Sequence, residues 1–305
     1  MRRRLKRSLE IGLVRSGLAE VWRRVSGKDA VVLAYHNLVP EGDGPLGDIS
    51  LHLPLPSFLA QMDLLSEACT IVPLQELIVA VRREGKPLAA ITFDDAYRGA
   101  LELGIPELIK RELPATVFVA PGLLGCEGFW WDQVADPSSG AVPQEFRRAA
   151  FRDFGGRQER ILETARSLGW KWGPMPDLYR PASEGAVDAL ALHPLVTLGS
   201  HTWSHVHLPS VPAAEAEAEL RRSRHWLEDR SVPNPILLSY PYGAYPEGME
   251  TSLLEAGYEA GFLIRGGAMR LRDVTAGRLV LPRVNIPRGL SPNGLRARIS
   301  GAWPA

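Results

Sequence analysis

The sequence predicts an α/β fold in which about seven parallel strands are joined by helical crossovers. After Gly27, short apolar runs alternate with amphipathic stretches, which is typical of strands that alternate with helices. Polar residues that could carry chemistry follow directly after several of these runs. A chain of 305 residues with 45% hydrophobic content can bury a large core, and it fits one α/β barrel as well as two smaller domains.

The first half of the chain contains three of the expected strands. Helices are expected at PSFLAQMDLLSEAC, at LQELIVAVRREG and near residues 97–112. Pro106 should kink or break the last of these, because it lacks a backbone N–H donor. The strands are AVVLAYH, which ends at His36, LAAITFDD, which ends at Asp94 and Asp95, and PATVFVA at 114–120.

The alternation is lost in the middle of the chain and resumes in its last third. The segment at about 125–194 is expected to be an insertion with helices of its own, because turn residues and Arg-rich helical patterns replace the strands there. A helix is expected at 213–230. The remaining strands are LVTLGSH, which ends at His201, PILLSYPYG, which ends around Tyr242, and the apolar segments at 258–264 and 278–286.

The first 27 residues predict an amphipathic helix with a strongly basic face, followed by a domain over 28–305. The start, MRRRLKR, is similar to that of a signal peptide, but Glu10 and Arg15 interrupt the apolar stretch and no small-residue cleavage site follows. This helix either packs on the domain or lies on an anionic membrane surface. The apolar positions at helical spacing are Leu5, Leu9, Leu13, Leu18, Trp22 and Val25.

Charge and cysteine content exclude some classes of function. The 35 basic and 35 acidic residues balance, so no global field attracts nucleic acid, and no nucleic-acid partner is expected. Cys69 and Cys126 form no CxxC pair and are expected to be ordinary thiols. No stretch is long and apolar enough to span a bilayer. We therefore expect a cytoplasmic protein, with peripheral contact at the inner face of the membrane as the alternative, and the sequence leaves its oligomeric state open.

Four polar clusters follow predicted strands, and the C-terminal ends of parallel barrel strands surround one mouth. A carboxylate and two neutral imidazoles suit a divalent ion with one open position, and such an ion lowers the pKa of water towards neutrality. A second carboxylate could then accept a proton. Taken alone, the aspartates could be a helix cap and the histidines a chance pair. The clusters are His36, Asp94 with Asp95, His201 with His205, and Pro241 with Tyr242.

Three motifs in order resemble those of the polysaccharide deacetylase family, also known as the NodB-homology or carbohydrate esterase 4 group. They are ITFDDAY at 91–97, HTWSH at 201–205 and SYPYG at 239–243. LAYHNLVP and SFLAQMDLL also resemble the start of many members, so the similarity runs from about Val31 to Arg288 without the insertion. The resemblance implies a distorted (β/α)7 barrel that hydrolyses an N-acetyl or O-acetyl group on a sugar.

The resemblance also assigns roles to individual residues. It implies that Asp94 is the catalytic base, and that Tyr242, after Pro241, supplies a backbone N–H to the oxyanion. Pro241, Tyr242 and Tyr245 are expected to contact the substrate. The expected ligands of one divalent ion, Zn²⁺ in the first place and Co²⁺ or Ni²⁺ as alternatives, are Asp95, His201 and His205.

The chain departs from the family pattern at three places. Ala96 replaces a usual glycine, which matters only if the backbone there needs positive φ. Ser239 stands where many members have the arginine that orients the base, and Arg283 could pair with Asp94 instead. No histidine follows His225, although many members use a late histidine as the acid. His36, which resembles the early histidine of the exopolysaccharide-associated subgroup, is the candidate acid; the alternative is a structural histidine at the mouth or an impaired enzyme.

Other histidines and tryptophans have weaker support. His207 is expected near the site but not in it, and His52, His193 and His225 are expected in a loop, the insertion and a helix. Four tryptophans could line a sugar cleft, but the core of the insertion is the favoured place for them. They are Trp130, Trp131, Trp170 and Trp172.

The leading hypothesis is a metal-dependent hydrolase that removes an acetyl group, N-acetyl in the first place, from a sugar of a polysaccharide or of its lipid-linked precursor. One alternative is a deformylase that acts on a lipid-linked formamido sugar. Another is a catalytically silent carbohydrate-binding barrel, which the missing late histidine and motif arginine would favour.

Overall fold

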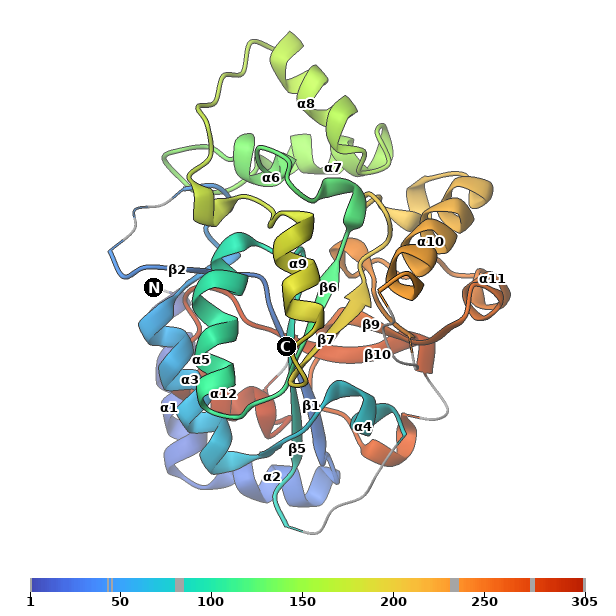
Figure 1. The fold of residues 1–305 in the computed structure, drawn as a ribbon. Coiled ribbons are helices and arrows are strands. Elements are labelled where there is room, and N and C mark those ends of the chain that lie inside the picture. Colours follow the sequence, from blue (N-terminus) through green and yellow to red (C-terminus); the bar gives the residue numbers. More distant parts are fainter. Residues whose placement is uncertain are drawn as a thin grey trace.

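The chain folds into a closed barrel of parallel strands surrounded by helices (Figure 1). The order around the barrel is β1, β10, β9, β8, β7, β6 and β5, and β5 pairs again with β1. The seven predicted strands and the α/β barrel are therefore confirmed. The computed structural model describes residues 2–42, 44, 46–79, 85–230, 236–274 and 278–303, with side chains from residue 9 onward.

Each barrel strand is short and almost wholly buried, because helices cover the outside and side chains fill the inside. Two further short pairings are present: β4 (Thr70–Ile71) joins β5 of the barrel sheet, and β2 (Asn37–Val39) pairs with β3 (His52–Pro54) in a separate two-stranded sheet. The barrel strands are β1 (Ala30–Tyr35), β5 (Leu88–Phe93), β6 (Ala115–Val119), β7 (Val196–Ser200), β8 (Ile236–Ser239), β9 (Tyr258–Gly266) and β10 (Leu281–Asn285).

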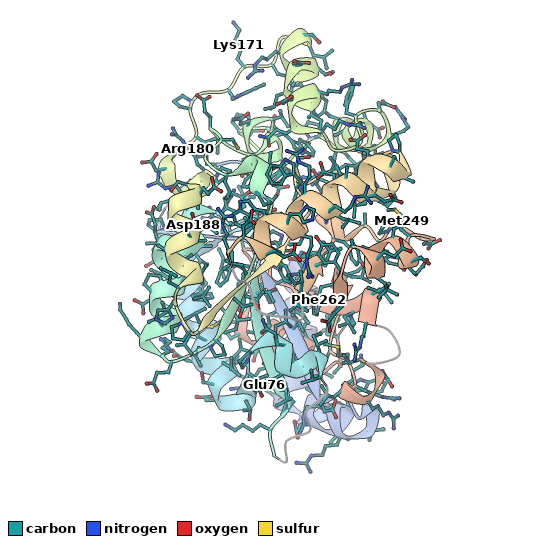
Figure 2. All side chains as sticks on the ribbon, turned by 45° about the vertical axis from the view of Figure 1, so that its right-hand side comes forward. Glu76, Lys171, Arg180, Asp188, Met249 and Phe262 are labelled. Carbon is teal, nitrogen blue, oxygen red and sulfur yellow. The ribbon has the colours of Figure 1, made fainter. Side chains whose placement is uncertain are left out.

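The alternation of side chains along β5 explains why Asp94 points into the barrel. Ile91 and Phe93 belong to the large outer core beneath the helices, whereas Ala90 packs with Phe118 and Phe262 in a separate cluster. Thr92, two residues after Ala90, contacts the buried Arg283 of β10. Side chains two apart share a face of a strand, so Asp94 continues the inward series Ala90, Thr92. Figure 2 shows Phe262 within the barrel.

The helices around the barrel largely follow the predicted pattern. The helix expected at 97–112 contains a π-helical turn, η1 (Ala100–Gly104), directly before Pro106, so the predicted irregularity is present. The wider turn removes the demand for a normal N–H at the proline. The helix expected at 74–85 ends at Ile78, and residues 80–84 lie outside the described part. The helices are α3 (Leu55–Ala68), α4 (Leu74–Ile78), α5 (Ile105–Lys110), α10 (Ala213–Glu228), α11 (Glu250–Glu255) and α12 (Pro292–Ile299).

Between β6 and β7 the chain forms an extra helical layer above one end of the barrel (Figure 1). It contains α6 (Trp130–Gln133), α7 (Gln144–Arg152) and α8 (Gln158–Ser167). The next helix, α9 (Glu184–Ala191), contacts β7 and runs beside the barrel, so it serves as the crossover helix. The extra layer is therefore shorter than the expected segment of about 125–194. Sequence could not separate α9 from it, because all four helices are short and similar in pattern.

The N-terminal segment is two helices, so the expectation of one helix over residues 1–27 was wrong. α1 (Arg2–Arg15) and α2 (Leu18–Ser26) are separated at Gly17, whose φ of 74° ends the first helix. Buried Glu10 fixes α1 against α12, since its carboxylate accepts a hydrogen bond from Ser291 and pairs with Arg298 at 3.5 Å. Within the described residues, no helix combines the length and apolar character that crossing a bilayer requires.

Candidate metal centre and catalytic residues

Three side chains from two strand ends meet in one buried cluster. Nε2 of His201 lies 3.1 Å from Nε2 of His205, and Oδ1 of Asp95 lies 3.4 and 3.2 Å from these two atoms. Tetrahedral zinc with bonds of about 2.0–2.2 Å would separate its ligand atoms by about 3.3–3.6 Å. The three atoms are therefore spaced like one face of such a site, and Asp95, His201 and His205 are the group in the described part of the chain that could hold a metal ion.

The hydrogen bonds around the cluster leave nitrogen and oxygen atoms available to bind a cation. Nδ1 of His201 lies 2.7 Å from the carbonyl oxygen of Ser239, to which it donates, so Nε2 is left with a free lone pair. Burial would raise the pKa of Asp95, but the adjacent imidazoles of His201 and His205 hold it well below its usual range. Burial and the neighbouring His201 lower the pKa of His205. Oδ1 of Asp95 is a buried acceptor with no hydrogen-bond partner among the described residues, as expected where a positive ion belongs.

Asp94 points to a different partner. Its two carboxylate oxygens accept a bidentate pair of hydrogen bonds from Arg283, at 2.8 Å to Oδ1 and 2.6 Å to Oδ2. Ser239 also donates to Oδ2, at 3.1 Å. Burial would raise the pKa of Asp94, but the Arg283 guanidinium keeps it below the ordinary value. The carboxylate is thus held ionised and in a fixed orientation.

Arg283 uses all of its donors. Nε donates to the carbonyl oxygen of Leu263, and the two terminal nitrogens donate to Thr92 and Ser239 as well as to Asp94. The side chain is fully buried. A buried guanidinium is tolerated only when its charge and its N–H groups are satisfied. Arg283 from β10 therefore orients Asp94 in a chain that has Ser239 at the expected arginine position of β8.

Loss of the Arg283 guanidinium should strongly destabilise the folded protein. We expect Arg283→Met to lower the free energy of unfolding by about 3–5 kcal/mol, because it leaves the Asp94 carboxylate buried and unpaired. Arg283→Lys should recover only part of the loss, since an ammonium cannot make the bidentate contact. Urea unfolding of the three proteins measures the effect. The matched control is Arg296→Met, which breaks a surface pair with Glu67 and should change stability by less than about 1 kcal/mol. A stable Arg283→Met protein would contradict this account.

The backbone at the site adopts a rarely populated conformation. In the described part of the chain, six non-glycine residues have positive φ, and five of them belong to the three motif loops. Ala96, at φ 52°, stands where the family pattern has glycine, so the departure does cost backbone energy. At Asp95 the positive φ of 69° turns the side chain out of the strand's alternation and towards the histidines. The five residues are Asp95, Ala96, Thr202, His205 and Tyr242.

The extra layer supplies one wall of the site. The ring of Trp131 packs on His205 at 4.8 Å between centroids, and Trp130 donates its indole N–H to the Tyr242 hydroxyl at 3.0 Å. Tyr242 itself packs on His205 at 4.5 Å. Trp130 and Trp131 are buried, as expected for core residues, but this core is shared with the site. They position His205 and Tyr242 from the side opposite the barrel.

Sequence reasoning missed a buried polar network centred on Asp132. Its Oδ1 accepts a hydrogen bond from Nε2 of His52 at 3.0 Å, and its Oδ2 accepts one from the Tyr97 hydroxyl at 2.6 Å. Tyr97 in turn accepts the indole N–H of Trp131 at 2.7 Å. Nδ1 of His52 also accepts a bond from the amide nitrogen of Asn37, which donates to the carbonyl of Leu178 as well, so Nε2 is the atom of His52 that donates to Asp132. The network ties the extra layer to the loop that follows Asp94.

The other candidate residues lie in different environments. His36 is half-buried and directly follows Tyr35 of β1, whose carbonyl accepts the backbone N–H of Asp94 at 2.9 Å, so it lies at the same mouth; burial lowers its pKa. Nδ1 of His207 shares a hydrogen bond with the Ser210 hydroxyl, and its ring stacks on Phe151, so His207 lies outside the cluster of Asp95, His201 and His205. The Tyr245 hydroxyl bonds to Glu250 at 2.6 Å, and its ring packs on Tyr240, so its contacts point to α11. Pro241 is buried at the start of the turn that carries Tyr242.

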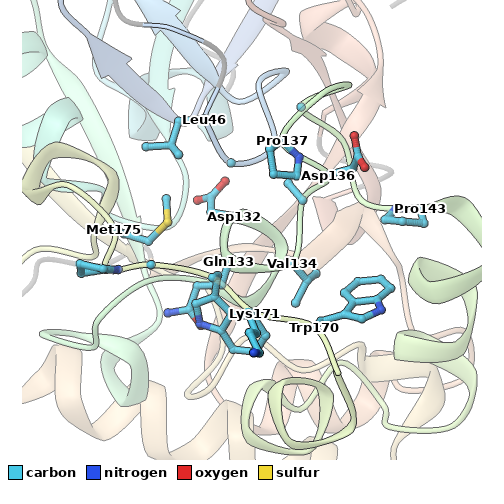
Figure 3. A pocket seen from close by; sticks show the side chains of 16 residues that line it. Leu46, Asp132, Gln133, Val134, Asp136, Pro137, Pro143, Trp170, Lys171 and Met175 are labelled. Atoms are coloured by element: carbon cyan, nitrogen blue, oxygen red, sulfur yellow. The ribbon is translucent and has the colours of Figure 1, made fainter. Parts of the chain in front are cut away.

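A separate cavity of about 430 Å³ lies in the extra layer (Figure 3). Trp170 and Trp172 line it, together with Lys171 and Met175. Asp132 of α6 lines the cavity, while the preceding residue Trp131 packs on His205. Asp95, His201 and His205 do not line this cavity. His193 and His225 are distant from both: His193 accepts a bond from the backbone of Leu195, and His225 is exposed on α10.

Comparison with known proteins agrees with this geometry. A family profile described as polysaccharide deacetylase matches residues 82–261. The "Putative polysaccharide deacetylase YxkH" of Bacillus subtilis (strain 168) is 23% identical over 273 residues, which cover 88% of this chain and 75% of that protein.

Solved structures share the fold. IcaB from Ammonifex degensii is similar with a TM-score of 0.62 at 19% identity, over 90% of this chain and 98% of that one. The Streptococcus pyogenes deacetylase PplD, in complex with acetate, has a TM-score of 0.61 at 16% identity, over 88% and 97% of the chains. The family profile spans more than half of the sequence and includes Asp94, Asp95, His201, His205 and Tyr242. The chain therefore belongs to the polysaccharide deacetylase family.

Proposed function

We propose that this protein is a metal-dependent deacetylase that removes the N-acetyl group from a sugar unit of a polysaccharide. Family membership supports deacetylation of a sugar. The observation that carries the rest is the pairing of a buried three-atom ligand cluster with an ionised carboxylate that Arg283 holds in place. Among proteins of similar fold, one from Aggregatibacter actinomycetemcomitans is described as a de-N-acetylase, which agrees with the choice of an N-acetyl group.

The metal ion would be held by Asp95, His201 and His205. Zinc suits one carboxylate and two imidazoles best, although Co²⁺ and Ni²⁺ accept the same ligands. When bound, the ion would polarise a carbonyl oxygen and make water more acidic. The orphaned Oδ1 of Asp95 and the fixed tautomer of His201 support this assignment.

Asp94 would take the proton of the attacking water. Its Oδ2 already accepts bonds from both Arg283 and Ser239, whereas Oδ1 accepts one bond, from Arg283. Oδ1 therefore keeps a lone pair for the proton, and we assign it as the basic atom. The bidentate contact fixes its direction, which preserves the reactive geometry between turnovers.

Two further residues would complete the reaction. The backbone N–H of Tyr242, in its left-handed turn, would donate to the oxyanion that forms as water adds to the acetyl carbon. The C–N bond then breaks, and His36 would give a proton to the departing sugar nitrogen, which leaves as an amine beside acetate. This role is supported by the position of His36 directly after β1, at the same mouth as Asp94, and by its buried Nδ1, which has no hydrogen-bond partner among the described residues.

The proposal is tested by product analysis. Zinc-loaded protein incubated with N-acetylglucosamine oligomers should release acetate and leave free amines, in equal amounts. Matched N-formylated oligomers separate this activity from a deformylase, which would release formate in preference. Oligomer binding without any product under zinc-replete conditions would instead identify a silent carbohydrate-binding barrel.

A further inference from the structure

The apolar side of α2 faces solvent. Leu18, Val21, Trp22 and Val25 are 57%, 56%, 53% and 78% exposed, and they recur at the spacing of one helical face. An amphipathic helix on a globular protein normally turns this side towards the core. The Trp22 indole N–H donates to the carbonyl of Gly301 at 2.9 Å, so the ring is anchored although it is half-exposed.

These residues form one continuous surface, here called the α2 face. Together with Leu13 of α1 and Ala302 near the C-terminus, they line a shallow groove of about 320 Å³. All six lining residues are apolar or small. A contiguous apolar patch of this kind on a described surface marks a contact with something apolar.

The segment that carries the α2 face has an excess of basic residues in its sequence. Residues 2–26 contain eight basic and two acidic residues, a net charge of +6, in a chain that is neutral as a whole. Both acids are already paired: Glu10 is buried against Arg298, and Glu20 bonds to Arg23 and Arg24. The hydrogen bond from Arg23 is the main reason why the pKa of Glu20 is lowered to about 2. The carboxylate therefore remains ionised beside Arg23 and Arg24. The net charge of this segment is therefore positive.

We propose that the α2 face docks on the surface of an anionic bilayer. Its apolar residues would enter the boundary between headgroups and acyl chains, and the basic residues around it would lie against the phosphates. Charge selects this occupant over a second copy of the chain, because two such faces would bring +6 against +6. The docking does not depend on the proposed enzymatic activity.

The position of the α2 face sets the orientation of the molecule. α2 ends at Ser26 and β1 begins at Ala30, so the face lies at the N-terminal ends of the barrel strands. The metal ligands and Asp94 follow the C-terminal ends, at the opposite pole below the extra layer (Figure 1). The mouth would then open away from the bilayer. If the proposed function holds, this orientation favours a sugar within a polymer over one attached to a lipid headgroup.

Vesicle co-sedimentation tests the docking. Purified full-length protein in 0.1 M NaCl should bind vesicles of equal parts phosphatidylglycerol and phosphatidylcholine at least about tenfold more strongly than vesicles of phosphatidylcholine alone. Val25→Asp should reduce binding to the anionic vesicles at least about tenfold, since it places a negative charge in the centre of the face. Leu192→Asp is the matched control, because Leu192 is 86% exposed outside this face and its change should have no effect.

Two further measurements protect the test against misfolding and self-association. In the unaltered protein, lipids brominated on their acyl chains should quench tryptophan fluorescence, and Trp22→Phe should remove most of the quenching while vesicle binding persists. Unchanged vesicle binding by Val25→Asp, or no quenching by brominated lipids, would overturn the proposal. A dimer in light scattering that Val25→Asp converts to monomer would overturn it as well. Acetate release serves as a separate readout, so failure of one proposal does not imply failure of the other.

Discussion

Replacing Asp94 by Asn should reduce acetate release by about 10²–10⁴-fold, the usual contribution of a general base. The substitution preserves size and keeps a hydrogen-bond acceptor for Arg283, but it removes the atom that would take the proton. Zinc affinity, measured by calorimetry on protein first freed of metal, should stay within about threefold of the unaltered protein, because the ligand atoms belong to Asp95, His201 and His205.

The control for this substitution acts on the same carboxylate. Ser239→Ala removes one hydrogen bond to Oδ2 of Asp94 and leaves the bidentate contact with Arg283 intact. We expect it to lower the rate by less than about tenfold, because the bidentate contact with Arg283 still holds the carboxylate ionised and oriented. Urea unfolding of both variants excludes a general loss of structure. An Asp94→Asn protein with half of the original activity would refute the assignment of the base.

Removal of the metal ion should have a comparably large effect. Treatment with a chelator, or His201→Ala, should lower acetate release by at least about 1000-fold, because the ion's stabilisation of charge is worth several kcal/mol and each 1.36 kcal/mol is a factor of ten. Zn²⁺ or Co²⁺ should restore the chelated protein but not the variant. His201 is chosen because its Nδ1 contact with Ser239 fixes the ring in its ligand orientation.

Zinc binding can also be followed without an activity assay. A ligand that binds only the folded state at 100 times its dissociation constant adds about 2.7 kcal/mol to the free energy of unfolding. Zinc should therefore raise the melting temperature of the unaltered protein and of His207→Ala, but not of His201→Ala. His207 is a suitable control because it is a nearby histidine outside the ligand cluster. A zinc-induced shift of equal size in all three proteins would exclude this site as the place of binding.

The barrel and the convergence of its polar ends could be predicted because both depend on local patterns. The run LAAITF carries no charged residue and is apolar except for Thr92, so a strand buried on both faces follows, and the first charged residues after it must lie at its end. The same reasoning applies to His201 after β7. Parallel strands in one barrel bring such ends together whatever lies between them in the chain.

The Asp132 network could not be predicted, because it depends on how the extra layer sits on the barrel. His52, Tyr97 and Asp132 come from three separate segments, and no spacing in the sequence relates them. The break at Gly17 is a failure of another kind, since the apolar positions on both sides continue at nearly helical spacing. Only the positive φ of Gly17 separates the two helices. Family resemblance suggested that Arg283 pairs with Asp94. The five hydrogen bonds that Arg283 donates could be identified only in the structure.

The crowding of left-handed backbone around the mouth has a consequence for evolution and engineering. Each such residue costs of order 1–3 kcal/mol, and the rest of the barrel must compensate for it. Selection for heat resistance alone would replace Ala96 or Thr202 by glycine, which adopts this conformation freely. The same change would loosen the loops that aim Asp95 and His205. Substitutions at these positions are therefore expected to raise thermal stability and lower the turnover rate together, sooner than substitutions at any position in the core.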